Sequence, residues 1–161
     1  MNEVRLESMS SEEYADYRER STASFAKEIA ASRGVPLAEA RRIADEDHSS
    51  LLPEGRRTPG HFLWTAWQGD QPVGDLWIQV EAKPDGLHAF AYGLEVRTDL
   101  RRRGYGRAIA FAAEQRCREM RVISVGLTVF GPNKAAQALY ESLGFETTVM
   151  QMRLRLTPRP G

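Results

Sequence analysis

Residues 94–120 constrain the fold of this chain more than any other stretch. A short apolar run at residues 94–96 leads into a turn rich in arginine and glycine, and then into a segment with apolar residues at helical spacing. A helix of this kind buries one face, so it needs a sheet to pack against. We therefore expect an α/β domain of the α+β type, with a mixed sheet and this helix lying across it.

The turn before this helix has the composition of an anion site. Glycine lets backbone amides approach a ligand closely, and the first N–H groups of a helix carry the positive end of its dipole. Arginine adds forked donors that match phosphate oxygens. The turn thus predicts a pyrophosphate cradle, although the same residues could form a solvated connection. The cradle residues are Arg101, Arg102, Arg103, Gly104, Tyr105, Gly106 and Arg107.

Two other phosphate-binding motifs are excluded by the sequence. A dinucleotide fingerprint G-x-G-x-x-G would need glycine at Ile109, and no P-loop Gly-Lys-Ser/Thr occurs.

Length and charge limit the classes of function. A chain of 161 residues is expected to form one domain, residues 1–161. The 22 Lys and Arg balance the 22 Asp and Glu, which argues against nucleic acid or an anionic membrane as partner. Cys117 is the single cysteine, so no internal disulfide can form, and we expect a cytoplasmic protein. Neither a membrane-spanning run nor a signal-peptide core is visible.

Turn and cap residues divide the chain into elements. Ser10 or Ser11 offers an N-cap, Gly34 a C-terminal stop, and Pro36 a helix start. Residues 53–60 are expected to form a loop, either a lid or an inert connection. The expected elements are a strand at 4–9, helices from 11 to about 33 and from 36 to about 51, strands at 61–68, 73–83 and 87–96, a helix at 104–121, a strand at 122–130, a helix at 134–143 and a strand at 145–156 that closes the sheet.

A second motif follows the predicted cradle at a separation that fits one strand. It reads N-x-x-A-x-x-L-Y and then G-F, at Asn133, Ala136, Leu139, Tyr140, Gly144 and Phe145. Together with R-x-x-G-x-G at residues 101–106, it resembles the GNAT superfamily of acetyl-CoA-dependent N-acetyltransferases. The resemblance covers residues 94–145. It implies a central, mostly antiparallel sheet with a parallel splayed pair, flanked by helices.

The resemblance assigns cofactor contacts to this chain. The turn amides of residues 102–107 would hold the CoA pyrophosphate, and main-chain groups of Leu94 and Val96 would pair with the pantetheine arm. The amide of Val96 or a neighbour would polarise the thioester carbonyl. Asn133 and Ala136 would lie near the same arm, and Asn133 also suits a helix N-cap.

The resemblance also suggests the groups that move protons. Tyr140 would protonate the departing CoA thiolate, or else be a core tyrosine. Glu95 would act as general base, directly or through water, unless it points away into a salt bridge. Related sequences often carry an acidic residue where this chain has Gly93, so Tyr92, His61 or the N-terminal helices are alternative sources of the base.

The sequence therefore predicts an N-acetyltransferase that joins acetyl-CoA and a primary amine in one ternary complex. The acceptor is a small molecule or a peptide, and its identity is not encoded in any recognisable motif. We expect no metal and no acetyl-cysteine at Cys117. Small members of the family often pair, so a homodimer is compatible with this reading. The alternative is a non-catalytic acyl-CoA-binding or sensing module that retains the cradle without the base.

Overall fold

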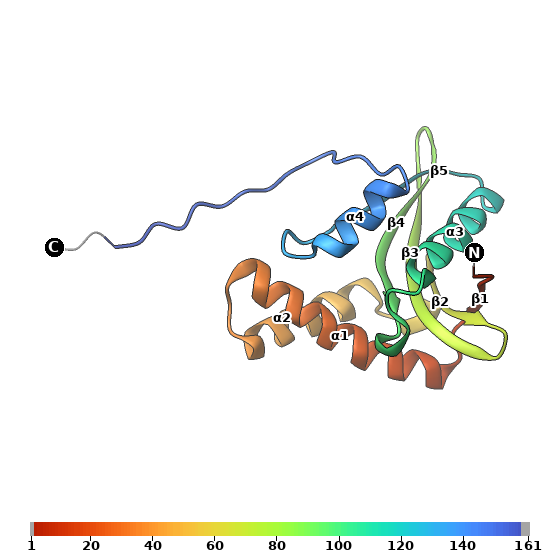
Figure 1. Ribbon diagram of the computed structural model, residues 1–161, viewed down its shortest axis with the longest axis horizontal. Helices are drawn as coiled ribbons and strands as arrows, with labels where there is room; N and C mark the ends of the chain where they lie inside the picture. Colours follow the sequence, from red (N-terminus) through yellow and green to blue (C-terminus); the bar gives the residue numbers. More distant parts are fainter. Residues whose placement is uncertain (1, 159–161) are drawn as a thin grey trace.

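The computed structural model describes residues 2–158, which form one five-stranded sheet with helices on both faces (Figure 1). The strands lie in sequence order; β1 to β4 are antiparallel and β4 and β5 are parallel. The mixed sheet predicted from the sequence is confirmed. The elements are β1 Arg5–Ser8, α1 Ser11–Arg33, α2 Leu37–Leu51, the 3-10 turn η1 Gly55–Arg57, β2 His61–Gln68, β3 Gln71–Lys83, β4 Gly86–Val96, the 3-10 turn η2 Thr98–Leu100, α3 Tyr105–Glu119, β5 Val122–Leu127 and α4 Lys134–Ser142.

Local capping sets the bounds of the α1–α2 hairpin. The Ser10 hydroxyl accepts a hydrogen bond from the Glu13 amide, and the Glu13 carboxylate accepts one from the Ser10 amide, which completes a capping box. Gly34 ends α1 with φ +68°, a conformation that favours glycine. Pro36 precedes α2 as predicted.

The two faces of the sheet carry separate parts of the core. On one face, Leu76 and Ile78 of β3 pack with Ile109 and Cys117 of α3. On the other face, Trp77 of β3 packs with residues of the α1–α2 hairpin, including Tyr17. Alternate residues of β3 thus serve opposite layers, because a strand points successive side chains to opposite sides. Among the described residues, no helix is long and apolar enough to cross a membrane.

Strand β4 is irregular near its C-terminal end. Trp77 pairs with Gly93 and Ile78 pairs with Ala91, so Tyr92 is an extra residue and forms a β-bulge. The parallel ladder with β5 runs only from Leu87 to Ala91. Its last pair joins Ala91 to Leu127, where β5 ends, and β4 continues to Val96 without a partner on that side in the part of the chain that the structure describes.

The strand predicted at residues 145–156 is wrong for this structure. These residues follow α4 in an extended course but pair with no other strand in the described chain (Figure 1). The predicted strand at 122–130 also ends earlier, at Leu127. An alternating pattern suits a strand, but a strand forms only where a neighbour completes its backbone hydrogen bonds.

Candidate active site

The predicted cradle lies where β4 passes into α3. Gly104 is the N-cap of α3 with φ +86°, and no side chain caps this helix end by a hydrogen bond. The first amides of α3 therefore keep their donor capacity for an anion. Arg102 has φ +64°, the left-handed region that favours glycine.

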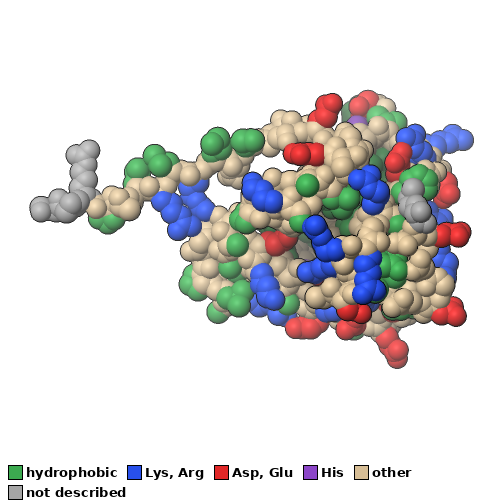
Figure 2. Space-filling view, in the orientation of Figure 1, with side chains coloured by type: hydrophobic (Ala, Val, Ile, Leu, Met, Phe, Trp, Pro, Cys, Tyr) green, Lys and Arg blue, Asp and Glu red, His purple; other side chains and the backbone are tan. Residues whose placement is uncertain are grey.

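The arginines around the cradle have different surroundings. Arg102 and Arg103 are exposed. Arg101 donates to the Val96 carbonyl oxygen at 3.4 Å, and Arg107 donates to the Ser142 hydroxyl at 2.8 Å, which links α3 to the end of α4. Figure 2 shows Lys and Arg side chains gathered over the middle of one face of the molecule. These positive charges are placed to favour a phosphate.

Two predicted cradle residues can contribute only backbone. The Tyr105 side chain is buried and donates to the Gln68 side chain, so its amide alone is available. A Cβ added to Gly106 would lie 3.2 Å from Leu139 Cδ2 of α4 and 3.8 Å from Val96 Cγ2 of β4. Glycine here allows α3, α4 and the end of β4 to meet closely.

The end of β4 offers a free strand edge beside the cradle. Gly93 to Val96 pair with β3 on one side, whereas the β5 ladder on the other side stops at Ala91. Their outward backbone groups can accept an extended ligand as an added strand. This matches the position that the resemblance assigns to Leu94 and Val96. The cradle and the free edge are contiguous, so the residues present fit acetyl-CoA.

Helix α4 forms the opposite wall of this space. The Asn133 side chain accepts a hydrogen bond from the Ala136 amide at 3.2 Å, which confirms its role as an N-cap. The Ala136 amide is thereby occupied. Tyr140 is half-buried and packs edge-on against Phe145, with 5.4 Å between the ring centroids. Burial, and next the charge of Glu28, raise the pKa of Tyr140, which keeps its hydroxyl protonated.

Glu95 points to the face of the sheet opposite α3. Its neighbours Leu94 and Val96 pack against the α3 core, and a strand alternates its side chains. Burial raises the pKa of Glu95, while Arg101 acts in the opposite direction. The ion pair to Arg101 is long, 3.5 Å, so it does not withdraw the carboxylate from the site. Glu95 is therefore half-buried near the free edge of β4 and loosely paired with Arg101.

A buried ion pair beside Glu95 anchors α1 to the sheet. Asp75 lies opposite Glu95 on β3 with its side chain 2% exposed. It accepts a hydrogen bond from Arg20 of α1 at 2.8 Å, and Arg97 lies 3.8 Å away. A buried carboxylate requires such partners. The pair fixes the separation between α1 and the end of β4.

Glu28 of α1 is a candidate site residue that was not predicted from the sequence. It is half-buried, and one carboxylate oxygen accepts a hydrogen bond from the side-chain Nδ2 of Asn133 at 3.1 Å. Burial raises its pKa, the Asn133 bond opposes this, and the charge of Glu95 adds to it. The available signal was its spacing, because Glu28 follows Phe25 by three residues on the inward face of a helix.

An aromatic cluster lies next to the bulge in β4. Tyr92 stacks on Trp77 at 4.6 Å and on His61 at 6.0 Å between ring centroids. The Trp77 indole donates to His61 Nδ1 at 2.9 Å, and burial lowers the pKa of His61. Tyr92 donates to Gln79 at 3.2 Å. Since His61 already accepts a hydrogen bond from Trp77, this cluster serves better as a wall than as a proton acceptor.

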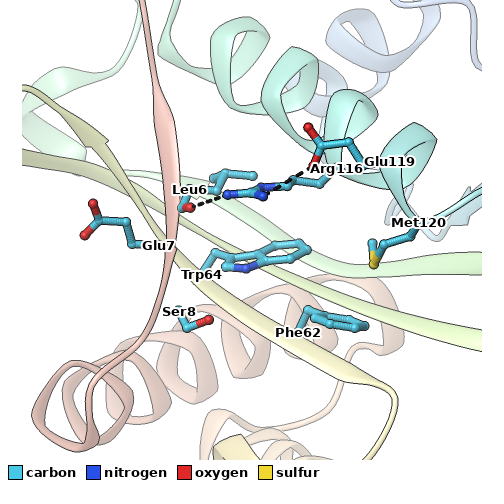
Figure 3. A pocket seen from close by; sticks show the side chains of 8 residues that line it. All are labelled: Leu6, Glu7, Ser8, Phe62, Trp64, Arg116, Glu119 and Met120. Atoms are coloured by element: carbon cyan, nitrogen blue, oxygen red, sulfur yellow. Dashed lines mark hydrogen bonds and ion pairs between the residues drawn. The ribbon is translucent and has the colours of Figure 1, made fainter.

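A separate hollow of about 490 Å³ lies at the other end of α3 (Figure 3). Arg116 donates to the Leu6 carbonyl oxygen there at 3.2 Å, above the rings of Trp64 and Phe62. It lies near the C-terminal end of the helix, whereas the cradle lies at the N-terminal end, so the two are distinct. No group of three or more metal-ligating side chains occurs within residues 2–158.

Comparison with known proteins gives consistent matches along the chain. The sequence matches the Acetyltransferase (GNAT) family over residues 13–145. It is 32% identical over 155 residues to the uncharacterized N-acetyltransferase YycN of Bacillus subtilis (strain 168), covering 95% of this chain and 99% of YycN. YdgE, an uncharacterized N-acetyltransferase of the same strain, is 29% identical over 153 residues, covering 94% of this chain and 97% of YdgE.

Solved structures agree with these matches. The crystal structure of YycN has a TM-score of 0.92 at 30% identity and covers 96% of this chain and 99% of that one. A putative acetyl transferase from Pyrococcus furiosus, at 22% identity, has a TM-score of 0.68 and covers 96% of this chain and 100% of that one. At this identity, the likeness shows the fold alone.

Proposed function

Because the chain belongs to the GNAT family of acetyl-CoA-dependent acetyltransferases, we propose that it acetylates a primary amine by direct attack within a ternary complex. The observation that carries this proposal is a pair of half-buried carboxylates beside the free edge of β4. Glu28 and Glu95 come from different elements, and burial raises the pKa of each. The charge of Glu95 adds to the raised pKa of Glu28. Tyr140, on α4, responds to the charge of Glu28.

The bound cosubstrate supplies an activated acetyl group as a thioester. The uncapped amides of α3 and the arginines of the cradle hold its pyrophosphate, and the free edge from Leu94 to Val96 holds its extended arm. A main-chain amide of this edge donates to the thioester carbonyl oxygen and stabilises the negative charge that develops on it. These contacts orient the carbonyl carbon toward the space lined by Glu28 and Glu95.

Proton movement follows from the two carboxylates and the tyrosine. The attacking amine must be uncharged, because protonation occupies its lone pair. Glu95, or Glu28 of α1 as the second carboxylate, accepts the proton that the nitrogen loses as the new C–N bond forms. The C–S bond then breaks, and the sulfur takes a proton from the Tyr140 hydroxyl, which is restored from solvent. A carboxylate with a raised pKa is better matched to a base at neutral pH than an ordinary one.

Conservative substitutions test these roles. Tyr140→Phe should lower kcat while the acetyl-CoA Kd stays constant. Glu95→Gln and Glu28→Gln should each lower kcat by roughly 10²-fold or more, the usual contribution of a general base. Glu46→Gln, at an exposed carboxylate on α2 that pairs with Arg42, is the matched control and should leave kcat unchanged. Unchanged turnover in all three site variants would refute the assignment.

The cradle can be tested separately from the chemistry. Gly104→Asp places bulk and negative charge at the start of α3 and should abolish the thermal stabilisation by acetyl-CoA. Gly69→Asp is a control for backbone strain, because Gly69 also has positive φ, +56°, with no neighbour within 4 Å. It should retain the stabilisation by acetyl-CoA. Binding that survives Gly104→Asp would place the pyrophosphate elsewhere.

The second candidate is a non-catalytic acyl-CoA-binding or sensing module, which glycine at position 93 favours. A Cβ at Gly93 would be 3.5 Å from the Tyr17 hydroxyl, so a small side chain would fit there but none is present. Both candidates predict stabilisation by acetyl-CoA. Only the enzyme releases free CoA when a panel of primary amines is added, so thiol release distinguishes them.

A further inference from the structure

Residues 147–156 have the pattern of a strand but no strand partner between residues 2 and 158, and β5 has an unpaired edge. We infer that two copies of the chain exchange this C-terminal segment. Residues 147–156 of one copy pair with β5 of the other, and the reverse pairing closes a symmetric homodimer. This inference is independent of the proposed chemistry. It rests on the pattern of the C-terminal segment, its course, and the position of β5 at the edge of the sheet.

The C-terminal segment has the pattern of a half-buried strand. Its residues alternate between an apolar and a more polar set, with a period of two. The apolar set is Thr148, Met150, Met152, Leu154 and Leu156. The other set is Thr147, Val149, Gln151, Arg153 and Arg155. Such a segment needs one strand beside it and one apolar surface beneath it.

Neither need is met within one chain. Four large side chains of the apolar set are almost fully exposed, namely Met150 at 73%, Met152 at 84%, Leu154 at 82% and Leu156 at 85%. Within the described residues, no main-chain hydrogen bond involves residues 146–158. Figure 2 shows hydrophobic side chains along this projecting segment. An exposed apolar run of this kind marks an interaction surface.

Strand β5 presents the complementary feature. It is the last strand of the sheet and pairs only with β4 among the described strands. Its own exposed apolar residue is Ile123, 58% exposed. Ser124 bonds to His88 at 2.6 Å on the open face of the sheet, so the adjacent Val125 points toward the α3 core. An added strand with one apolar and one polar face would extend both layers.

The course of the segment identifies a second copy as the partner. Arg153 donates to the carbonyl oxygens of Ser32 and Arg33, at the C-terminal end of α1, where the helix dipole is negative. Arg155 lies against Gly34. These contacts carry the segment toward the loop of the α1–α2 hairpin, and Figure 1 shows this loop and β5 on opposite sides of the molecule.

Reciprocal exchange provides a partner both for the C-terminal segment and for the edge of β5. Each copy offers one strand and one edge, so a two-fold arrangement uses both and leaves no open end for further growth. In the dimer, each sheet gains the strand that the sequence pattern predicts at residues 145–156. That strand comes from the other chain. It also tethers α4, which immediately precedes the segment and has no buried residue of its own.

Light scattering of the full chain tests the oligomeric state. We expect a mass of twice 18.1 kDa. Met152→Glu with Leu154→Glu charges the apolar face and should shift the chain to monomer, weakening association at least 100-fold. Thr147→Glu with Gln151→Glu adds the same charge to the other face and should leave the dimer intact. A wild-type monomer at high concentration, or a dimer that persists with both glutamates on the apolar face, would overturn the inference.

Disulfide trapping distinguishes exchange from other dimers. Ser124→Cys on the open face of β5 is combined in turn with Thr147→Cys, Val149→Cys or Gln151→Cys, which share the other face of the segment. The native Cys117 is buried and does not compete. Exchange predicts a covalent dimer for at least one pair under mild oxidation. A disulfide within one chain, or none for any pair, would show that the segment does not lie on the β5 of a partner.

Discussion

The parts of the chain before and after Cys117 differ in how they are packed. All buried residues among those described lie at or before Cys117, most of them in β1 to β4 and α1 to α3. After it, β5 is only partly covered and α4 has no buried residue. Burial of apolar surface is the main source of stability, so the first part should hold the fold and the second should open more easily.

The candidate site lies across the boundary between these two parts. Glu95 belongs to the well-packed part, and Glu28 lies on α1, which a buried ion pair holds against the sheet. Asn133 caps α4 and Tyr140 lies on it. Side-chain contacts such as that from Asn133 to Glu28 join this region to the first part. The carboxylates thus lie on well-packed elements, whereas Tyr140, the proposed proton donor, lies on the less buried α4. Catalytic geometry would then depend on what holds α4 in place.

The largest expected effect compares equivalent truncations in the two parts. Ile109 of α3 is fully buried, so Ile109→Ala should lower the free energy of unfolding by about 4 kcal/mol. Leu139 of α4 is half-buried, and Leu139→Ala should cost less than about 1 kcal/mol. Chemical denaturation of both variants measures the difference. Equal costs would mean that α4 is as well packed as α3.

The next prediction probes the tightest contact in the first part. A Cβ at Gly74 of β3 would collide with the Glu95 carbonyl oxygen and lie 2.7 Å from Ile109 Cδ1. Gly74→Ala should therefore cost about 3 kcal/mol through overpacking. Gly131→Ala in the second part meets nothing within 4 Å and serves as the control, with a change near zero. A tolerated Gly74→Ala would break the comparison.

A pH titration of stability should sharpen the comparison. Burial, followed by the charge of Arg18, lowers the pKa of His48 from 6.5 to about 4. The unfolded chain therefore takes up a proton first as the pH falls, so this contribution is complete above pH 6.5 and is lost down to about pH 4. The free energy of unfolding should fall by roughly 2 to 3 kcal/mol over this window.

The non-titrating variant His48→Gln isolates this contribution. It should have a shallower pH dependence than the wild type, measured by denaturation at each pH. Glu28 and Glu95, whose pKa values are raised, act with the opposite sign and are common to both proteins, so they cancel in the difference. Parallel curves for the two proteins would exclude His48 as the source.

The smallest effect is expected at the cradle itself. Arg102 has positive φ, so Arg102→Gly relieves strain but gains freedom in the unfolded chain. We expect a net stabilisation below about 1 kcal/mol. Arg102→Ala keeps the strain and removes the same charge, so it separates the two effects when the unfolding free energy and the acetyl-CoA Kd are measured. A destabilised Arg102→Gly would contradict the strain argument.

Much of the fold could be predicted because its signals are local. Ser10, Gly34, Pro36 and Asn133 act on residues within one helical turn, so their types alone indicate where helices begin and end. The turn before α3 is also set by local residues, because Gly104 adopts the positive φ that glycine favours, so the start of this helix could be predicted from the sequence. The direction of Glu95 also followed from strand alternation once its neighbours were known to be core.

What the sequence determined by itself was the order and bounds of its helices and most strands, the family, and the arginine- and glycine-rich turn at the start of α3. Only the tertiary structure decided that Glu28 meets Asn133 across 105 positions of chain, that Tyr92 bulges out of β4, and that residues 145–156 leave the sheet that their pattern suits. Each of these depends on which surfaces meet in space, and local spacing carries no information about the partner.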